Sequence, residues 1–314
     1  MSLPTLLVTG GSGFIGRSLL ETVRREGLDQ SYRVVLLSSR AVPGWETVPD
    51  GRAGDGLYRF TAEDFVSRGV DAVDSVIHLG AFTPKDAKEA EDVAGSMANM
   101  HNTRHLLVSL PTAPRRLVYA SSIDVYGPAE GQITEDVSCR PRSLYGISKL
   151  FCERMLASLV TEPRYSGTSL QVVRIGHTYG AGEEQYRKFI PETIRRLLRG
   201  EAPHFFTDGS EKRAFIHVGD CSRLILAALE SPADVGPINL ASETALPLNV
   251  IADHLCRIHG ASGGLPIKPT YGPQPTEGSD VVFDVAKMER YLGRTTVPIE
   301  EGLRGEYLAA KCGQ

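Results

Sequence analysis

The sequence predicts an α/β fold: a doubly wound parallel sheet with a smaller C-terminal α/β cap that binds substrate. Two observations lead to this prediction. Between residues 6 and 175, short apolar runs of strand length alternate with helical segments, which is typical of βαβ units and a parallel sheet. Beyond residue 180 the elements become shorter, with Pro- and Gly-rich connections. This indicates a cap over the carboxyl edge of the sheet, where ligands bind in open α/β folds.

The individual elements follow from the apolar periodicity. Strands of the sheet are expected at residues 6–9, 32–37, 57–61, 76–81, 116–122 and 170–175. Helices are expected between them at about residues 14–26, 87–110 and 144–159. Residues 41–56 are rich in Gly, Pro and Asp and predict a loop. In the second half, helices are expected at residues 189–199, 220–229 and 248–259, and extended segments at residues 213–218 and 238–240.

These elements suggest two domains. Residues 1–176 with about 214–240 would form a dinucleotide-binding domain, and about 177–213 with 241–314 the cap. The first strand of that first domain is followed by Gly10, Gly13 and Gly16, a spacing close to the GxGxxG of dinucleotide-binding folds.

Each of the three glycines has a physical role in such a turn. The first permits a sharp bend, the second lets the backbone approach a diphosphate, and the third lets the helix pack on the sheet. The helix N-terminus, with Phe14 and Ile15, offers free N–H groups and a positive dipole to phosphates. An ordinary glycine-rich turn has the same composition, so the motif alone leaves both interpretations open.

Composition excludes several classes of protein. The 314 residues are 41% hydrophobic and 23% charged, as in a soluble globular protein. A net charge of −4 and the lack of a long basic run argue against a nucleic-acid partner. No apolar run approaches the roughly 20 residues that span a bilayer. Five scattered cysteines, with no signal peptide before the first strand, favour a cytoplasmic protein with free thiols. We expect no metal site, because His101 and His105 share a helix face without a third ligand.

The end of the second strand bears on the choice of cofactor. An acidic residue there accepts hydrogen bonds from a ribose 2′-hydroxyl, whereas an arginine accommodates a 2′-phosphate. This chain has Ser38, Ser39 and Arg40 instead of an acid. The pattern favours NADP(H), with NAD(H) possible; an exposed loop without a ligand is the alternative.

The catalytic prediction rests on a serine, a tyrosine and a lysine. Tyr145 and Lys149 are four apart at the start of a helix and therefore share a face. A nearby ammonium lowers the pKa of a phenol, which can then exchange a proton with a carbonyl while a nicotinamide exchanges hydride. Ser122, at the end of the preceding strand, would hold the same carbonyl oxygen. The YxxxK pattern alone occurs often by chance and gains weight only with the glycine turn and this serine.

Together, these motifs identify a family. The chain resembles the extended short-chain dehydrogenases/reductases, in the nucleotide-sugar epimerase/dehydratase group. The motifs that carry the resemblance lie at residues 10–16, 76–80, 99–103, 121–127, 145–149 and 174–180. In the cap, the turn at residues 208–210 with Arg213 looks like the part that meets a nucleotide-sugar diphosphate.

The resemblance implies a Rossmann domain, a bound nicotinamide dinucleotide and catalysis by Ser122, Tyr145 and Lys149. It also implies cofactor contacts by Leu79, Gly80, Ala81 and Asn99, and a homodimer formed through the helices around residues 89–109 and 145–159. Substrate contacts are expected from Thr83, Ser122, Tyr145, Arg213 and His177. His177 stands where the family often has an asparagine, and packing under the cap is the equal alternative.

Departures from the family pattern narrow the reaction. Family dehydratases carry Asp and Glu after the catalytic hydroxyl, but this chain has Ile123 and Asp124, which makes 4,6-dehydration improbable. Family epimerases commonly have an acid after the second strand and hold NAD permanently, and that acid is missing. A second diphosphate arginine, expected near residues 274–278, is also absent; Glu277 stands there.

Three hypotheses follow. The first is an NADP(H)-dependent reductase of a keto group on a nucleotide-diphosphate deoxysugar, with Tyr145 as the proton donor. The second is an NAD-dependent nucleotide-sugar 4-epimerase with tightly bound cofactor. The third is a non-catalytic dinucleotide sensor, which the intact Ser122, Tyr145 and Lys149 disfavour.

Overall fold

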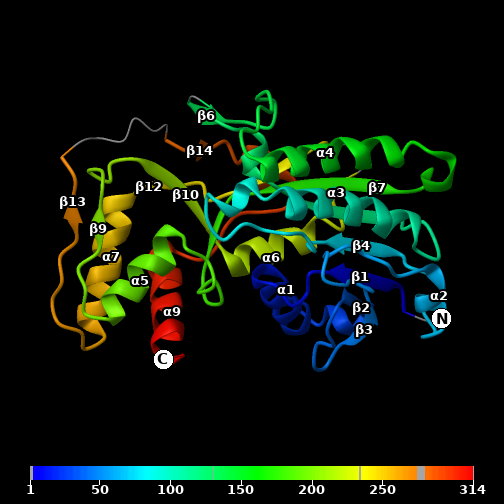
Figure 1. The fold of residues 1–314 in the computed structure, drawn as a ribbon, viewed down its shortest axis with the longest axis horizontal. Coiled ribbons are helices and arrows are strands. Elements are labelled where there is room, and N and C mark those ends of the chain that lie inside the picture. The colour runs from blue at the N-terminus through cyan, green and yellow to red at the C-terminus, as the bar shows by residue number, and fades with distance from the viewer. Residues whose placement is uncertain (1–2, 130, 233–234, 274–279, 314) are drawn as a thin grey trace.

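A computed structural model describes residues 3–129, 131–232, 235–273 and 280–313. Its centre is a parallel sheet in which the described residues form seven strands, in the order β11-β7-β5-β4-β1-β2-β3 (Figure 1). The predicted doubly wound sheet is therefore confirmed, with the reversal of strand order at β1 and β4. The strands of this sheet are β1 (Thr5–Thr9), β2 (Arg33–Ser38), β3 (Glu46–Pro49), β4 (Ser75–His78), β5 (Arg116–Ser122), β7 (Ser169–Ile175) and β11 (Ile238–Leu240).

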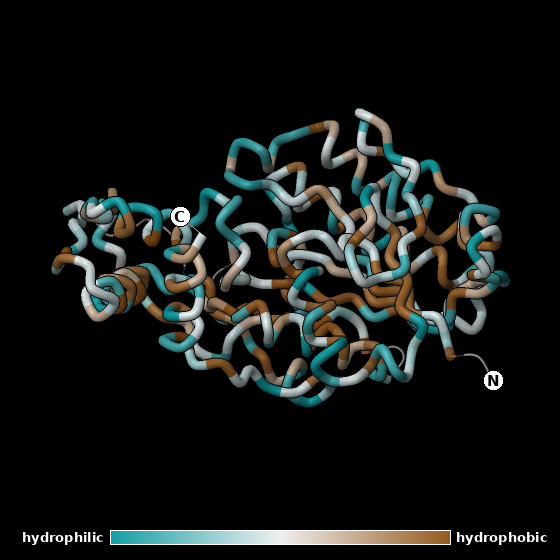
Figure 2. The backbone as a smooth tube through the Cα atoms, turned by 90° about the horizontal axis from the view of Figure 1, so that it is seen from below, coloured by the Kyte–Doolittle hydropathy of each residue, from teal (hydrophilic) through white to brown (hydrophobic). Residues whose placement is uncertain are grey.

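Helices cover both faces of the sheet. α1 (Phe14–Arg25) packs beside α6 (Val218–Ala227), and α3 (Val93–Val108) packs beside α4 (Leu144–Leu159) on the opposite face (Figure 1). Because side chains alternate along a strand, Leu6 and Val8 of β1 join the apolar core beneath α1, while Leu7 joins the core beneath α3. The apolar segments gather accordingly in the middle of this half (Figure 2).

The third strand differs from the prediction. β3 is formed by Glu46–Pro49, inside the predicted loop, and residues 57–61 form no strand. The alternation that suggested a strand is real, since Tyr58 and Phe60 are buried and their neighbours are not. The backbone N–H of Tyr58 is bonded instead by the Asn102 side chain of α3, at 2.7 Å. The side chains of this segment are therefore alternately buried although its backbone does not pair with a neighbouring strand.

The smaller part of the chain lies at one end of the sheet (Figure 1). Its three-stranded sheet is made of β12 (Ala245–Pro247), β10 (Lys212–His217) and β8 (His177–Tyr179). α5 (Phe189–Leu198), α7 (Leu248–Ala261) and α9 (Ile299–Cys312) share an apolar core beside it. The boundary predicted at residue 214 falls within β10, and the division into two domains remains a prediction.

Short elements complete the described chain. Two further strand pairs join β13 (Thr270–Tyr271) to β9 (His204–Phe205), and β14 (Val282–Phe283) to β6 (Gln132–Ile133). The remaining helices are α2 (Ala62–Val66), α8 (Ala286–Tyr291), and the 3-10 turns η1 (Leu28–Gln30), η2 (Glu89–Glu91), η3 (Ile123–Val125) and η4 (Pro163–Tyr165). The helix expected from residue 87 begins only at Val93, after Asp92, whose carboxylate accepts a hydrogen bond from the Gly95 N–H. In the described part of the chain, we find no helix that is long and apolar enough to cross a membrane.

Candidate active site

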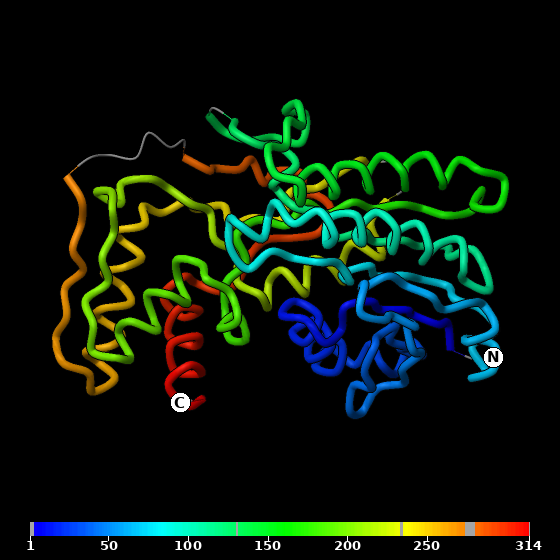
Figure 3. Tube along the Cα trace, viewed as in Figure 1, coloured from blue at the N-terminus to red at the C-terminus, as the bar shows by residue number. Residues whose placement is uncertain are grey.

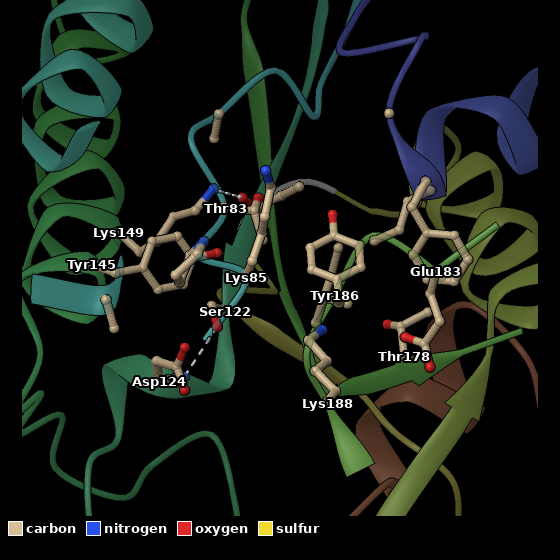
Figure 4. A pocket seen from close by; sticks show the side chains of 18 of the residues that line it. Thr83, Lys85, Ser122, Asp124, Tyr145, Lys149, Thr178, Glu183, Tyr186 and Lys188 are labelled. Carbon is tan, nitrogen blue, oxygen red and sulfur yellow. Dashed lines mark hydrogen bonds between the residues drawn. The ribbon is translucent and has the colours of Figure 1, made fainter. Parts of the chain in front are cut away.

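A cavity of about 900 Å³ lies at the carboxyl ends of the central strands, between the sheet and the smaller part of the chain. Its walls come from the turn after β1, the segment after β4, the end of β5, the first turns of α4, and the segment after β8. Figure 4 shows Tyr145, Lys149 and Ser122 on one side of this cavity and Glu183 on the other, with Tyr186 and Lys188 between them.

The glycine turn forms a narrow part of the wall. Gly10 has φ +72°, and a Cβ added to it would lie 2.7 Å from the Gly80 nitrogen. A Cβ on Gly16 would lie 2.1 Å from the Gly10 carbonyl oxygen. No other residue fits these two positions without moving the backbone. Gly13, Phe14 and Ile15 line the cavity at the start of α1, so backbone N–H groups and the helix dipole face it, as a diphosphate requires.

The structure brings the three predicted catalytic side chains together. Tyr145 and Lys149 lie on one face of α4, which begins after Ser143, whose hydroxyl accepts a hydrogen bond from the Gly146 N–H. The Lys149 ammonium donates to the Ala120 carbonyl at 2.8 Å and lies 5.8 Å from the centre of the Tyr145 ring. Ser122, the last residue of β5, lines the same cavity (Figure 4).

The expected effect of Lys149 on Tyr145 is not found. Burial raises the pKa of the Tyr145 phenol above its ordinary value, the Asp124 carboxyl raises it further, and hydrogen bonds with Ser122 and Thr83 oppose the rise. Burial also lowers the pKa of Lys149 to about 8. The chain's own residues therefore keep Tyr145 protonated at neutral pH, and Lys149 remains mostly charged there but loses its proton as pH rises through about 8.

Asp124 is the carboxyl group nearest to this centre. It lies in η3, directly after β5, and its backbone N–H donates to the Ser122 hydroxyl at 3.2 Å. Burial raises the pKa of the Asp124 carboxyl. The preceding Ile123 also lines the cavity, so an apolar side chain stands where family dehydratases have an acid.

The predicted substrate residues lie toward the smaller sheet. Thr83, His177 and Arg213 all line the cavity. His177 Nδ1 is buried without a hydrogen-bond partner among the described residues, and burial, with the charges of Arg213 and Lys188, lowers the pKa of the ring to about 4. His177 is thus neutral at pH 7. Residues 274–278, where a second arginine was expected, lie outside the described residues.

Comparisons with known proteins agree with this arrangement. Residues 6–241 match the sequence profile of the NAD dependent epimerase/dehydratase family. The chain belongs to this family. It is accordingly a member of the extended short-chain dehydrogenases/reductases, as its motifs predicted.

Individual relatives differ in the reactions that their names describe. The chain is 32% identical to dTDP-glucose 4,6-dehydratase of Streptomyces griseus, covering 71% of this chain and 68% of that protein. It is 26% identical to ADP-L-glycero-D-manno-heptose-6-epimerase of Nitratidesulfovibrio vulgaris, covering 77% of each. A solved structure of RMD from Pseudomonas aeruginosa, complexed with NADPH, has a TM-score of 0.78 at 21% identity, covering 99% of this chain and 100% of that one. This last similarity shows the fold.

In this epimerase/dehydratase-family protein, the end of β2 is arranged differently from the prediction. Ser38 lines the cavity, but Ser39 and Arg40 are exposed and do not. Arg52 lines it instead, held by Asp50 at 2.7 Å. Arg52 follows β3. The sequence predicts the third strand at residues 57–61, so Arg52 falls in a predicted loop and is not recognised as a cavity residue.

Asn99 is not a cavity residue either. Its side chain accepts a hydrogen bond from the Phe82 N–H at 2.7 Å and donates to the Phe82 carbonyl at 3.1 Å. Both polar ends of the amide are thereby used within the protein. Asn99 holds the segment after β4, in which Leu79, Gly80 and Ala81 line the cavity; their contacts with a cofactor remain a prediction.

The sequence reasoning missed the segment after β8. Glu183, Tyr186 and Lys188 of this segment line the cavity (Figure 4). The Tyr186 ring packs on Phe14, with ring centres 6.2 Å apart, and the Lys188 ammonium lies 4.6 Å from the centre of the Tyr186 ring. Gly180 and Gly182, both with positive φ, precede these residues. This pair of glycines was the feature of the sequence that could have indicated a second tight turn at the cavity.

Proposed function

We propose that the protein is an NADP(H)-dependent oxidoreductase that reduces a keto group of a nucleotide-diphosphate sugar of the deoxysugar class. The observation that carries this proposal is the convergence of Ser122, Tyr145 and Lys149 in the cavity that also contains the glycine turn. Gly10 and Gly16 leave no space for a side chain, which fits a diphosphate held by backbone N–H groups.

The chain's own residues supply a proton donor. A nicotinamide dinucleotide supplies the hydride when it is bound. The raised pKa of Tyr145 keeps its phenol protonated at neutral pH, which suits donation to the oxygen of a carbonyl that is being reduced. Ser122 would hold that oxygen, and Lys149, anchored on the Ala120 carbonyl, would hold the cofactor ribose.

The cofactor preference rests on charge. Ser38, at the end of β2, has no carboxylate, and the Arg52 guanidinium lines the cavity nearby. Both features favour a 2′-phosphate. Structures of similar fold are described with NAD and with NADPH, so the comparisons leave the choice open.

The nucleotide-sugar part of the proposal is supported by the relatives and by two residues. Proteins acting on ADP-, dTDP- and UDP-linked sugars are among the relatives. Arg213 and neutral His177 line the cavity from the smaller sheet. A guanidinium is suited to bind a diphosphate, and an unpartnered imidazole to bind a sugar hydroxyl.

Reduction can be tested with a panel of nucleotide 4-keto sugars, by following NADPH oxidation. Replacing Tyr145 by Phe removes the proton donor and should lower kcat by about 10²-fold or more. Tyr165→Phe is the matched control, because Tyr165 is buried and donates to the Leu107 carbonyl at 3.1 Å outside the cavity. Full turnover by Tyr145→Phe would refute the assignment of this tyrosine.

A 4-epimerase is the second candidate, favoured by a relative named as a putative UDP-glucose 4-epimerase and by the family description. Such an enzyme oxidises and re-reduces one carbon and retains its cofactor. Denaturing the purified protein and measuring released NAD(H) separates the two: a stoichiometric amount supports epimerisation. A 4,6-dehydratase is disfavoured because Ile123 has no proton to donate.

We also propose that the protein forms a homodimer through α3 and α4. Four large apolar side chains on these helices are solvent-exposed: Val93 (59%), Met97 (60%), Ile147 (46%) and Phe151 (50%). A second copy of the same face would cover them. Light scattering should give a dimer mass for the wild type and a monomer mass for a Met97→Glu/Phe151→Glu variant; a wild-type monomer would refute this proposal.

A further inference from the structure

Two glutamates lie buried together beside the cavity. Glu183, from the segment after β8, and Glu306, from α9, are each only 2% exposed. Their side chains are within hydrogen-bonding reach of one another. Glu306 Oε2 accepts a hydrogen bond from the Gly180 N–H at 3.0 Å, whereas Glu183 Oε2 is buried and receives none from the described residues.

A close approach of α9 produces this pairing. A Cβ added to Gly302 would lie 2.3 Å from the Tyr179 hydroxyl, so this glycine lets α9 lie directly against β8. Glu306 is four residues later on the same helix face and therefore reaches the turn after β8.

A cation compensates the two carboxyl groups only in part. Among the described residues, neither Glu183 nor Glu306 forms an ion pair, and the charge of the exposed Lys188 lowers the pKa of Glu183 by less than burial raises it. Two adjacent buried carboxylates without a counter-ion are strongly unfavourable, so a proton is retained instead. Burial, and then the charge of Glu306, raises the pKa of Glu183 well above its ordinary value; burial also raises the pKa of Glu306, while the Gly180 N–H opposes that rise.

The pair lies close to the start of α1. Arg17 of α1 donates to the Gly182 carbonyl at 3.1 Å, and Tyr186 packs on Phe14. Glu183 and the glycine turn therefore line one end of the same cavity. An ionised carboxylate there would repel a diphosphate, whereas a neutral carboxyl group would not.

We propose that Glu183 is a neutral, proton-carrying residue of the dinucleotide site, hydrogen-bonded to Glu306, and that loss of its proton weakens dinucleotide binding. This inference rests on the proposed function only for the class of ligand. The proton stays on the carboxyl pair and no bond of the ligand is made or broken.

Several other titratable or charged groups surround the pair, and the test must distinguish them. They are Glu184, Tyr186 and Lys188 on the same segment, Tyr179 on β8, Glu301 on α9, Asp220 on α6, His217 before α6 and Arg17 on α1. Lys149, whose pKa is about 8, also faces the cavity and titrates in the same range.

NADPH binding, followed by its fluorescence between about pH 7 and pH 10, tests the inference. The 2′-phosphate has its second pKa near about 6 and is constant in this range. Wild-type Kd should rise about tenfold per pH unit once Glu183 ionises. Glu183→Gln keeps a neutral polar group of the same size and should remove this rise.

Two further variants sharpen the result. In Glu306→Gln the new amide can donate to Glu183 and stabilise its carboxylate, so the rise in Kd should begin at lower pH. Glu201→Gln is the control: Glu201 is exposed and accepts from the Arg199 Nε at 2.9 Å, away from the cavity, and its variant should keep the wild-type profile.

The outcomes separate this inference from the proposed function. If neither NADPH nor NAD⁺ binds the wild type near pH 7, the proposed function fails, and this inference with it. If a dinucleotide binds but Kd is independent of pH, or Glu183→Gln retains the rise, the proton belongs elsewhere, as on Lys149. The inference is then wrong and the function stands. Should Glu183→Gln not fold, the direction of the Glu306→Gln shift decides.

Discussion

Two buried glutamates of this protein, one in α4 and one in the segment after β8, are stabilised in opposite ways. Glu153 of α4 faces Arg174 of β7, with Nη2–Oε2 and Nε–Oε1 distances of 2.8 and 3.1 Å, and it also accepts from Ser121. Glu183 faces another carboxyl group. Both are almost fully buried.

The difference shows that burial alone does not decide the charge of a carboxyl group. Glu153 has a bidentate cation, which is among the strongest pairings available in a protein interior. Glu183 has Glu306, for which the favourable solution is a proton. The first arrangement fixes α4, with Tyr145 and Lys149, against β5 and β7; the second leaves a group that responds to pH.

The largest expected effect comes from removing the cation. Arg174→Leu leaves the Glu153 side chain buried without its partner and should lower the free energy of unfolding by about 3–5 kcal/mol. Urea unfolding measures the change. The control is Arg59→Leu, because the Arg59–Asp55 pair is exposed to solvent and its loss should cost far less. Equal losses of stability in the two variants would contradict the expectation that the buried ion pair contributes more than the exposed one.

A loss of similar size is expected from Glu153→Gln. The amide keeps the shape of the side chain but leaves the buried Arg174 guanidinium, which keeps its proton, without a counter-ion, so the free energy of unfolding should again fall by about 3–5 kcal/mol at pH 7. The same replacement at Glu183 should not destabilise the protein at that pH, because Glu183 is already neutral. Comparable losses at both sites would mean that Glu183 is ionised.

The smallest expected effect is a change of the free energy of unfolding with pH. The pKa of Glu183 is raised in the folded protein, so the folded state binds more protons than the unfolded state. Its contribution to stability is therefore complete below the ordinary Glu pKa and is lost as pH rises toward the folded pKa. Relative to Glu183→Gln, the wild type should lose about 1.4 kcal/mol per pH unit across that window. Thermal unfolding of the ligand-free protein at several pH values, with the exposed Glu201→Gln as control, measures this slope; parallel curves of the wild type and Glu183→Gln would contradict it.

The glycine turn and the catalytic helix were predictable because each depends on local chemistry. Gly10 and Gly16 are required where the chain approaches itself closely, and α4 occupies the predicted residues 144–159. Tyr145 and Lys149 share a face of that helix as a consequence of its period.

The remaining features depend on contacts that the sequence order does not show. The backbone of Tyr58 is bonded by Asn102 rather than by a strand, which hid both β3 and Arg52. Asn99 has the composition of a ligand-binding residue, but Phe82 uses its amide. Glu183 and Glu306 are separated by more than a hundred residues. Their pairing, and the proton that it implies, can therefore be inferred only when the packing of α9 on β8 is known.

The path of the chain has a consequence for engineering. After β7 the chain enters the smaller sheet through β8 and β10, returns through α6 and β11, and leaves again through β12 and α7 (Figure 3). It then returns to pair β14 with β6 before ending in α9, which packs on α5 and α7. In a hybrid in which a single junction joins the first part of this chain to the remainder of a relative, α1 would come from this chain and α6 from the relative. The two helices that pack against each other would then no longer come from the same protein. Exchange of specificity between such enzymes needs several coordinated junctions, and the cap is not a module that can be grafted as a single segment.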